Sequence, residues 1–253
     1  MRQILIRQFG TNSIFAVDGF DVGASVRRYK RLSRAQTKDI HVIFGHMPFG
    51  WHEVLEEPVT YVTLLREPVA RIASHYQYVL RTPDAVLHNE TVTSALTLSD
   101  YPIRSSGASV FNNGQTRLLA GPLLAEDFSP TDNTLEVAKR NLSQHFAIAG
   151  VTERFDESLI LMAGRLGWKA PLYSSFKVAP HPYPQKELDV ARDTLLARNE
   201  LDHQLHRFAS DRLEDLISTG LSDRYLQVYR WKNRLFRLYQ QLGRLSRRAV
   251  EIQ

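Results

Sequence analysis

The sequence predicts an α/β fold built around a mainly parallel sheet. Short apolar runs recur along the chain, and helical or loop segments separate each run from the next, which is the pattern of such folds. Of the 253 residues, 43% are hydrophobic and 23% are charged. That balance is typical of globular proteins and excludes a disordered or fibrous chain.

Four apolar runs are predicted to be strands. They are rich in β-branched and aromatic residues and occupy residues 13–17, 39–46, 59–65 and 146–151. Runs this apolar suit strands that are buried on both faces, as in a parallel sheet. In such sheets ligands bind beyond the carboxyl ends of the strands. The residues that follow each run are therefore candidates for function.

The helices are predicted from apolar periodicity and from their end signals. Residues 2–9 are predicted to be the end of a helix that stops at Gly10. Pro68 stands just before residues 69–80, and proline at the first helical position loses no needed hydrogen bond. The other predicted helices are residues 22–38, 135–144, 155–166 and 187–218, the last of them broken near Asn199. Residues 82–114 and 168–185 are predicted to be loops.

The basic character of the chain belongs to its tail. Residues 221–253 hold eight Lys or Arg residues against Asp223 and Glu251, a net charge of +6. The net charge of residues 1–220 is therefore −1, although the net charge of the whole chain is +5. We therefore divide the chain into a domain, 1–220, and a basic helix, 221–253. A neutral body without a recognised motif argues against nucleic acid as a partner.

The sequence contains no Cys, which excludes disulfides and Cys-ligated metals. No run of about 18 apolar residues is present, which argues against a transmembrane helix. The N-terminal segment before Gly10 is too short and too charged for a signal peptide. We expect a cytoplasmic location, with peripheral membrane contact as a second interpretation. His41, His46, His52 and His75 lack a metal-ligand spacing, so we expect no metal.

Residues 65–76 carry the clearest chemical signal. Arg66 ends a predicted strand and Ser74 lies two helical turns later, so both side chains can converge on one anion near a helix N-terminus. Arginine suits phosphate because its planar fork binds two oxygens at once. The structural alternative for Arg66 is an ion pair with Glu67 or another carboxylate. Arg71 is predicted to be a structural ion-pair partner, on a different helix face from Ser74.

A resemblance to a known family rests on this segment. Arg66-x-Pro68-x-x-Arg71-x-x-Ser74-x-Tyr76 resembles the 3′-phosphate-binding motif of sulfotransferases that use 3′-phosphoadenosine 5′-phosphosulfate (PAPS). Among these, the sequence is most similar to the heparan sulfate 2-O-sulfotransferase-like group and its bacterial relatives. Four more segments resemble that group in the same order, and they are residues 44–50, 113–117, 150–156 and 199–205.

The resemblance implies a P-loop-NTPase-like parallel sheet flanked by helices, and transfer of a sulfuryl group from PAPS to a hydroxyl of a glycan or glycolipid. It implies that His46 is the general base, for which histidine has a suitable pKa. It also implies that Arg66 and Ser74 hold the 3′-phosphate and that Lys177 adds a nucleotide contact. The alternative for His46 is a hydrogen-bonded structural residue. Gln115 and Arg117 either cap a helix or touch substrate.

Enzymes of this group begin with a strand and a P-loop-like segment that grips the 5′-phosphosulfate. The 253-residue sequence contains no such segment, and residues 2–9 resemble the helix that follows it. We therefore expect the segment to precede Met1 in a longer protein, and the 253-residue chain to lack its main sulfate-activating group. The alternative hypothesis is a non-catalytic relative that binds nucleotide or glycan and self-associates through its tail.

The tail carries a heptad pattern. Its apolar residues recur at alternating spacings of 3 and 4, and this seam consists of Val228, Trp231, Leu235, Leu238, Leu242, Leu245, Ala249 and Ile252. We rank two interpretations first: a coiled-coil homodimer, or docking of the seam on the body of its own chain. Contact of the basic helix with an anionic membrane or polysaccharide ranks second.

Overall fold

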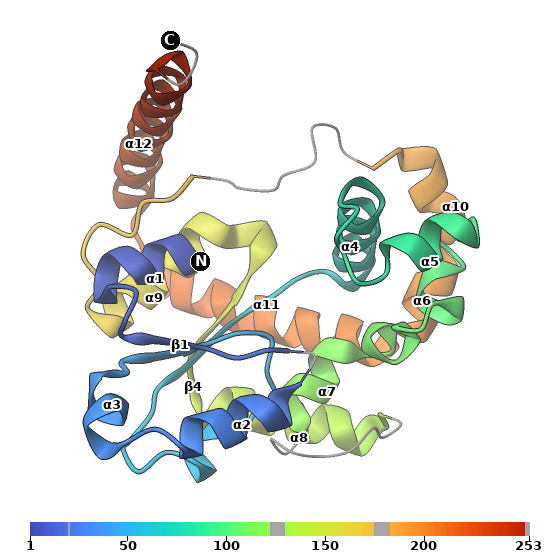
Figure 1. The fold of residues 1–253 in the computed structure, drawn as a ribbon, viewed down its shortest axis with the longest axis horizontal. Helices are drawn as coiled ribbons and strands as arrows, with labels where there is room; N and C mark the ends of the chain where they lie inside the picture. The colour runs from blue at the N-terminus through green and yellow to red at the C-terminus, as the bar shows by residue number, and fades with distance from the viewer. Residues whose placement is uncertain (20, 122–129, 175–182, 251–253) are drawn as a thin grey trace.

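The computed structural model describes residues 1–19, 21–121, 130–174 and 183–250, without the side chains of residues 109 and 243–250. Helices make up most of the described chain (Figure 1). The α-helices are α1 (Arg2–Phe9), α2 (Val22–Lys30), α3 (Arg34–Asp39), α4 (Pro68–Arg81), α5 (His88–Thr93), α6 (Tyr101–Arg104), α7 (Gly114–Ala120), α8 (Asp132–Gln144), α9 (Phe155–Leu166), α10 (Gln185–Arg198), α11 (Glu200–Gly220) and α12 (Asp223–Val250). The short 3₁₀ helices are η1 (Trp51–Glu53), η2 (Ala108–Phe111) and η3 (Thr152–Arg154).

The four predicted strands are present and parallel, but they form two separate pairs. β1 (Ile14–Ala16) pairs with β2 (Val42–Phe44), and β3 (Tyr61–Leu65) pairs with β4 (Phe146–Val151). The prediction of one sheet is therefore wrong for the described residues, because no strand among them bonds to both pairs. The α/β class itself is confirmed. Parallel pairing brings the carboxyl ends of β1 and β2 together, and likewise those of β3 and β4.

Two glycines let the chain continue side by side beyond β1 and β2. A Cβ atom on Gly45 would lie 2.7 Å from the carbonyl oxygen of Val17, and one on Gly19 would lie 2.8 Å from that of His46. Real Cβ atoms do not approach backbone oxygens so closely, so any larger residue would push the two segments apart. The close approach thereby fixes the backbone at His46, next to Gly45.

Helices cover the strands with separate apolar clusters. Leu65 of β3 and Val151 of β4 pack with buried leucines of α7, α8 and α11. A second cluster joins α4, α6 and α10 around Ile72, Tyr101 and Leu195. This second group of helices lies on the right of the strands in Figure 1. The junction between β3 and α4 therefore lies between the two clusters.

Three predicted helix boundaries are confirmed by local geometry. Pro68 is the first residue of α4, and Glu67 caps it by accepting a hydrogen bond from the amide of Ala70 at 2.7 Å. Gly167 ends α9 with a left-handed φ of 67°. The long helical stretch after residue 184 breaks at Asn199, between α10 and α11.

Other predictions of elements need correction. The helix predicted over 22–38 is two helices, because Ser33 starts α3 with a capping box that it forms with Gln36. The predicted loop 82–114 contains α5, α6 and η2, and α7 was not predicted. The part of the predicted loop 168–185 that the structure describes is irregular until α10 begins.

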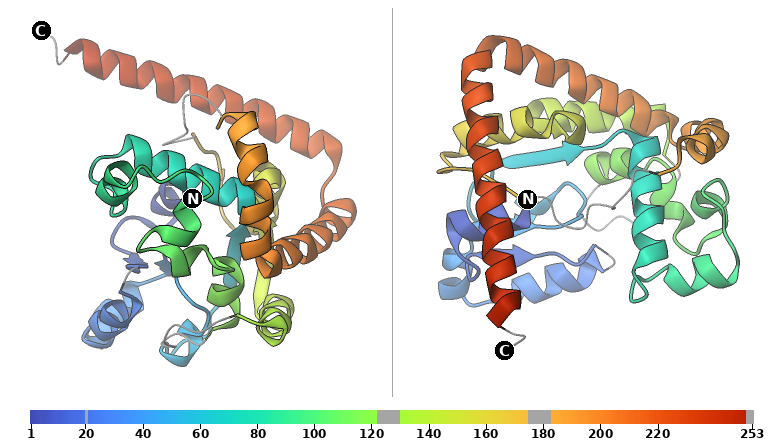
Figure 2. Two further views of the ribbon diagram at one scale, coloured as in Figure 1. Left: turned by 90° about the vertical axis from the view of Figure 1, so that its right-hand side faces the viewer. Right: turned by 90° about the horizontal axis from the view of Figure 1, so that it is seen from above.

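Helix α12 packs on the body through the side opposite the seam. Leu226 and Tyr229 are buried with Ile4 of α1 and with α9. The Tyr229 hydroxyl donates to the carbonyl oxygen of Pro171 at 2.9 Å. The described seam residues, 228 to 242, are exposed instead. Docking on its own body is therefore contradicted for the described seam residues, and Figure 2 shows α12 along the outer boundary of the molecule.

None of the helices in the described part of the chain combines the length and the apolar composition needed to span a bilayer.

Candidate active site

The imidazole of His46 follows the carboxyl end of β2 and keeps an exposed surface. Desolvation by the surrounding protein lowers the pKa of His46 below 6.5, and the positive charge of Arg71 lowers it further. A lowered pKa keeps the imidazole neutral near pH 7. Neutral imidazole is the form that accepts a proton, so His46 is suited to act as a general base.

Arg71 and His75 lie one turn apart on α4 and share the surroundings of His46. Burial lowers the pKa of His75, and the charges of Arg71 and His46 lower it further. Nδ1 of His75 lies 2.9 Å from the hydroxyl of Tyr101. The guanidinium of Arg71 lies 3.7 Å from the fully buried carboxylate of Asp202. Arg71 is therefore the ion-pair partner that the sequence predicted.

Asp202 binds the start of α7 as well as Arg71. Its carboxylate accepts hydrogen bonds from the amides of Gln115 at 3.1 Å and Thr116 at 2.7 Å. The side chain of Asn113 accepts from the amide of Asp202 at 3.0 Å, and the amide of Asn113 donates to Asn199 at 3.2 Å. Two motifs that lie more than 80 residues apart in the sequence thus form one buried unit.

The side chain of Gln115 holds the backbone where β3 ends. The amide of Arg66 donates to Oε1 of Gln115 at 2.9 Å, and Nε2 of Gln115 donates to the carbonyl oxygen of Arg66 at 2.9 Å. A neighbouring strand would make the same paired contacts. Gln115 thus caps no helix with its side chain, and no sequence signal pointed to this role. Burial lowers the pKa of Arg117, whose role stays open.

Two carboxylates use backbone donors at the start of α4. Glu67 accepts from Ala70, and the amide of Glu67 donates to Glu153 at 3.0 Å. Glu153 also lies 3.1 Å from Nε2 of His206. Burial alone would raise the pKa of Glu153, but hydrogen bonds from His206 and from the Glu67 amide hold it at about 2. The amides of residues 67 and 70 thus already have acceptors, so this helix start is less open to an anion than the sequence suggested.

The side chains of Arg66 and Ser74 remain available to a ligand. Arg66 follows directly after β3 and is partly buried, and Ser74 lies in the second turn of α4. Glu67 caps the helix, and the structure gives Arg66 no ion pair with any residue that it describes. The alternative that Arg66 pairs with Glu67 is therefore contradicted. Lys177 lies outside the described residues, so its nucleotide contact stays a prediction.

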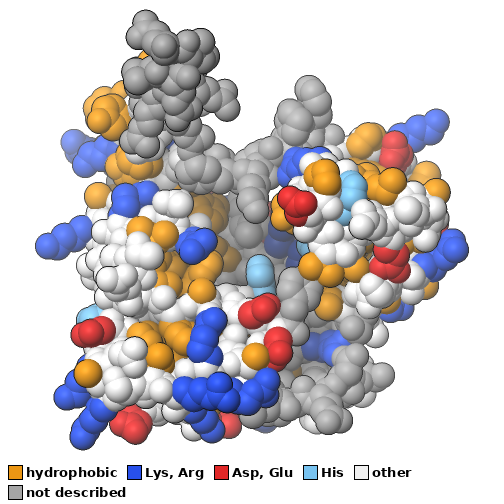
Figure 3. All heavy atoms as spheres, in the orientation of Figure 1, with side chains coloured by type: hydrophobic (Ala, Val, Ile, Leu, Met, Phe, Trp, Pro, Cys, Tyr) orange, Lys and Arg blue, Asp and Glu red, His pale blue; other side chains and the backbone are white. Residues whose placement is uncertain are grey.

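The surface in Figure 3 is hollowed between the side with α1–α3 and the side with α4–α6. A histidine and basic side chains lie within this hollow. Among the described residues, no group of three or more His, Asp or Glu side chains is arranged to hold a metal ion.

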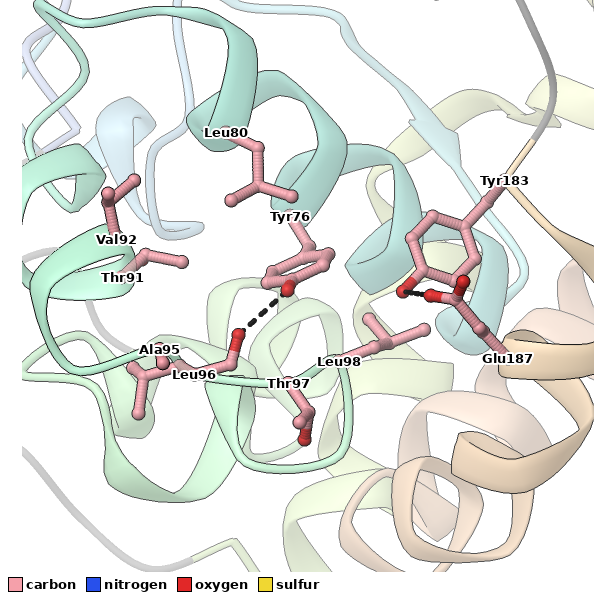
Figure 4. A pocket seen from close by; sticks show the side chains of 10 residues that line it. All are labelled: Tyr76, Leu80, Thr91, Val92, Ala95, Leu96, Thr97, Leu98, Tyr183 and Glu187. Carbon is pink, nitrogen blue, oxygen red and sulfur yellow. Dashed lines mark hydrogen bonds between the residues drawn. The ribbon is translucent and has the colours of Figure 1, made fainter.

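A separate pocket of about 400 Å³ lies beside α4 (Figure 4). Leu80, Val92 and Leu96 form part of its apolar wall. The hydroxyls of Tyr76 and Tyr183 are already bonded, to the carbonyl oxygen of Leu96 at 2.7 Å and to Glu187 at 2.9 Å. None of the described lining residues is a Lys or Arg, so this pocket is unsuited to a phosphate.

A family model described as galactose-3-O-sulfotransferase matches residues 23–207, which is more than half of the chain. The chain belongs to the galactose-3-O-sulfotransferase family. The matched range contains all five motif segments that the sequence singled out. No curated protein matches the chain.

Membership in the galactose-3-O-sulfotransferase family confirms the coarse prediction of a sulfotransferase that transfers a sulfuryl group to a carbohydrate. It supports the PAPS-using class in general but not the heparan sulfate 2-O-like group in particular. The match ends within α11, so α12 lies outside it.

Proposed function

We propose that the protein transfers the sulfuryl group of PAPS to a carbohydrate hydroxyl, with His46 as general base. The acceptor oxygen forms a bond to sulfur while the bond between sulfur and the 5′-phosphate oxygen breaks. The hydroxyl proton passes to an imidazole nitrogen of His46, and 3′-phosphoadenosine 5′-phosphate leaves. The observation that carries the proposal is the family match over residues 23–207, which includes His46 at an exposed position just after β2.

In this proposal Arg66 and Ser74 hold the 3′-phosphate and so position the nucleotide. The support is that Arg66 lacks an ion pair within the described residues, while Gln115 holds its backbone on both sides. A phosphate dianion would give this guanidinium a bidentate partner. The two residues position the donor and take no part in bond making.

For the acceptor we propose the 3-hydroxyl of a galactose residue. The support is the description of the matched family, which names that sugar and that position. The near-neutral charge of residues 1–220 favours an uncharged glycan or glycolipid over a polyanion such as heparin.

Titration calorimetry with 3′-phosphoadenosine 5′-phosphate tests the nucleotide site. We expect saturable binding to the full chain, and at least a tenfold loss of affinity in Arg66→Ala. Arg165→Ala, an exposed arginine on α9, is the matched control and should bind like the wild type. Equal binding by both variants would rule out Arg66 as the phosphate ligand.

Transfer of labelled sulfate from PAPS to a galactoside, by the chain extended at its N-terminus with a strand and P-loop-like segment, tests the base. We expect His46→Ala to abolish transfer while nucleotide affinity is kept, and exposed His41→Ala to have no effect. Full activity in His46→Ala would exclude His46 as the base. Nucleotide binding without turnover in that extended chain would favour the alternative hypothesis, a non-catalytic binding protein.

A further inference from the structure

Helix α12 has two opposite faces, and only one of them is covered. Leu226, Tyr229 and Asn233 are buried against the body, and Asn233 accepts a hydrogen bond from the amide of Tyr173 at 2.7 Å. Successive helical residues turn by about 100°, so the seam centres about 180° from this docked face. The seam residues are well exposed: Val228 44%, Trp231 60%, Leu235 45%, Leu238 50% and Leu242 66%.

The docked face is held firmly enough to fix which side of α12 looks outward. Arg230 lies 3.3 Å from both Asp156 and Glu157 of α9, and the guanidinium of Arg237 lies 4.6 Å from the centre of the Tyr173 ring. The orientation of α12 is thus set by polar contacts as well as by burial. The apolar seam therefore lies outward on the folded protein.

Cations border the exposed seam on both sides. On the helical wheel, Lys232 lies next to one edge of the seam and Arg234 next to the other, and both are exposed. Exposed Tyr239 and Trp231 add aromatic rings on the same side. Residues 224–250 contain eight Lys or Arg residues and no Asp or Glu. An apolar stripe with basic borders and aromatic rings is the pattern of helices that lie in a membrane interface.

We propose that α12 binds the surface of an anionic phospholipid bilayer through this seam. A second copy of the chain fits less well, because the positions that flank the seam of a coiled coil set the pairing. Along residues 228–242 they are Gln227, Lys232, Arg234, Tyr239 and Gln241, which include cations but no acid to pair with them. Residues 1–220 have a net charge of −1 and would not be attracted to an anionic bilayer. The positive charge that attracts such a bilayer therefore comes from the helix alone.

Co-sedimentation of the full chain with vesicles tests the proposal. We expect binding to phosphatidylcholine vesicles that contain one-quarter phosphatidylglycerol, and little binding to phosphatidylcholine alone. Trp231→Ala/Leu235→Ala should weaken partitioning at least tenfold because apolar contact is lost. Lys232→Gln/Arg234→Gln should weaken it about thirtyfold, since each cation near an anionic surface contributes about 1 kcal/mol.

Matched variants on the body serve as controls. Val86→Ala/Val190→Ala removes apolar side chains that are 73% and 75% exposed, and Lys30→Gln/Arg34→Gln removes two exposed cations. We expect both controls to bind like the wild type. Circular dichroism confirms that each variant is folded.

Three results would overturn the proposal. One is a folded wild-type protein that does not co-sediment with anionic vesicles. Another is unchanged binding in both α12 variants. The third is a dimer, seen by analytical ultracentrifugation without lipid, that Trp231→Ala/Leu235→Ala converts to a monomer, since that would assign the seam to a second copy.

Discussion

At the scale of single residues, the protonation of His46 depends on neighbours from another element. The surrounding protein removes water from the imidazole, and Arg71 of α4 adds a positive charge nearby. Both effects disfavour the imidazolium form. Asp202 holds Arg71 in place, so a residue of α11 acts on the histidine indirectly.

We predict that Arg71→Gln raises the pKa of His46 toward 6.5 without reaching it. The variant removes the repulsion by the guanidinium but leaves the larger effect of burial. The pKa of His75 should also rise, because Arg71 lowers it as well. NMR titration of the two imidazoles measures both values. Arg165→Gln, with its exposed arginine on α9, is the control, and no upward movement in Arg71→Gln would contradict the prediction.

At the scale of elements, the junction of β3 and α4 is held by side chains from later parts of the chain. Gln115 of α7 binds both backbone groups of Arg66, and Glu153 of η3 binds the amide of Glu67. Neither side chain takes part in the proposed chemistry. Their effect is to fix the direction in which the Arg66 side chain leaves the strand.

We predict that Gln115→Ala weakens binding of 3′-phosphoadenosine 5′-phosphate several-fold and lowers the free energy of unfolding by about 1–3 kcal/mol. The variant leaves a partly buried N–H and C=O of Arg66 without partners. Titration calorimetry and urea unfolding measure the two effects. Gln204→Ala, at an exposed position on α11, should change neither. Unaltered nucleotide affinity in a destabilised Gln115→Ala would show that Gln115 only stabilises the fold.

The carboxylate of Glu153 makes stability depend on pH. Its pKa is about 2 in the folded protein against an ordinary 4.5, so the ionised form is favoured by folding. This contribution is complete above pH 4.5 and is lost as the pH falls toward 2. We predict that Glu153→Gln lowers the urea midpoint at pH 6 and that its difference from the wild type shrinks below pH 4.5. Glu136→Gln, which breaks an exposed pair on α8, should show a much smaller difference at pH 6.

The elements that the sequence predicts well have local causes. The start of α4 follows from Pro68, and the end of α9 follows from Gly167, whose left-handed backbone favours glycine. Helix α7 could not be predicted, because its first amides find their acceptor in Asp202, far along the chain. The role of Gln115 could not be predicted for the same reason. Spacing within one segment carries no information about a partner more than 40 residues away.

At the scale of the whole molecule, the candidate residues came from motif resemblance, and the contacts that hold the elements around them came from the structure. The sequence pointed to His46, to a convergence of Arg66 and Ser74, and to Arg71 as an ion-pair partner. The structure adds Asp202 as the partner that links Arg71 of α4 to α11. The heptad pattern identified the seam but not the side of α12 that it occupies. That choice depends on a second stripe at similar spacing, Leu226, Tyr229 and Asn233, which finds its partners in the body.

A leucine-to-alanine substitution should lower the free energy of unfolding much more on the docked face of α12 than on the exposed seam. Leu226→Ala should lower the free energy of unfolding by about 2–4 kcal/mol, because Leu226 is 9% exposed and packs with α1 and α9. Leu235→Ala, at a position that is 45% exposed, should change it by less than about 0.5 kcal/mol. Urea unfolding without lipid measures both. Equal losses would mean that α12 does not dock as described.

The contacts across the β3–α4 junction also determine when, during synthesis, the site can form. A ribosome delivers His46, Arg66 and Ser74 first, but Glu153 and Asp202 emerge much later. Until residue 202 is outside the exit tunnel, the amides of Gln115 and Thr116 lack their carboxylate, and the end of β3 lacks its fixed neighbour. A nascent chain that pauses before α11 therefore carries the candidate site residues without the contacts that fix the elements around them.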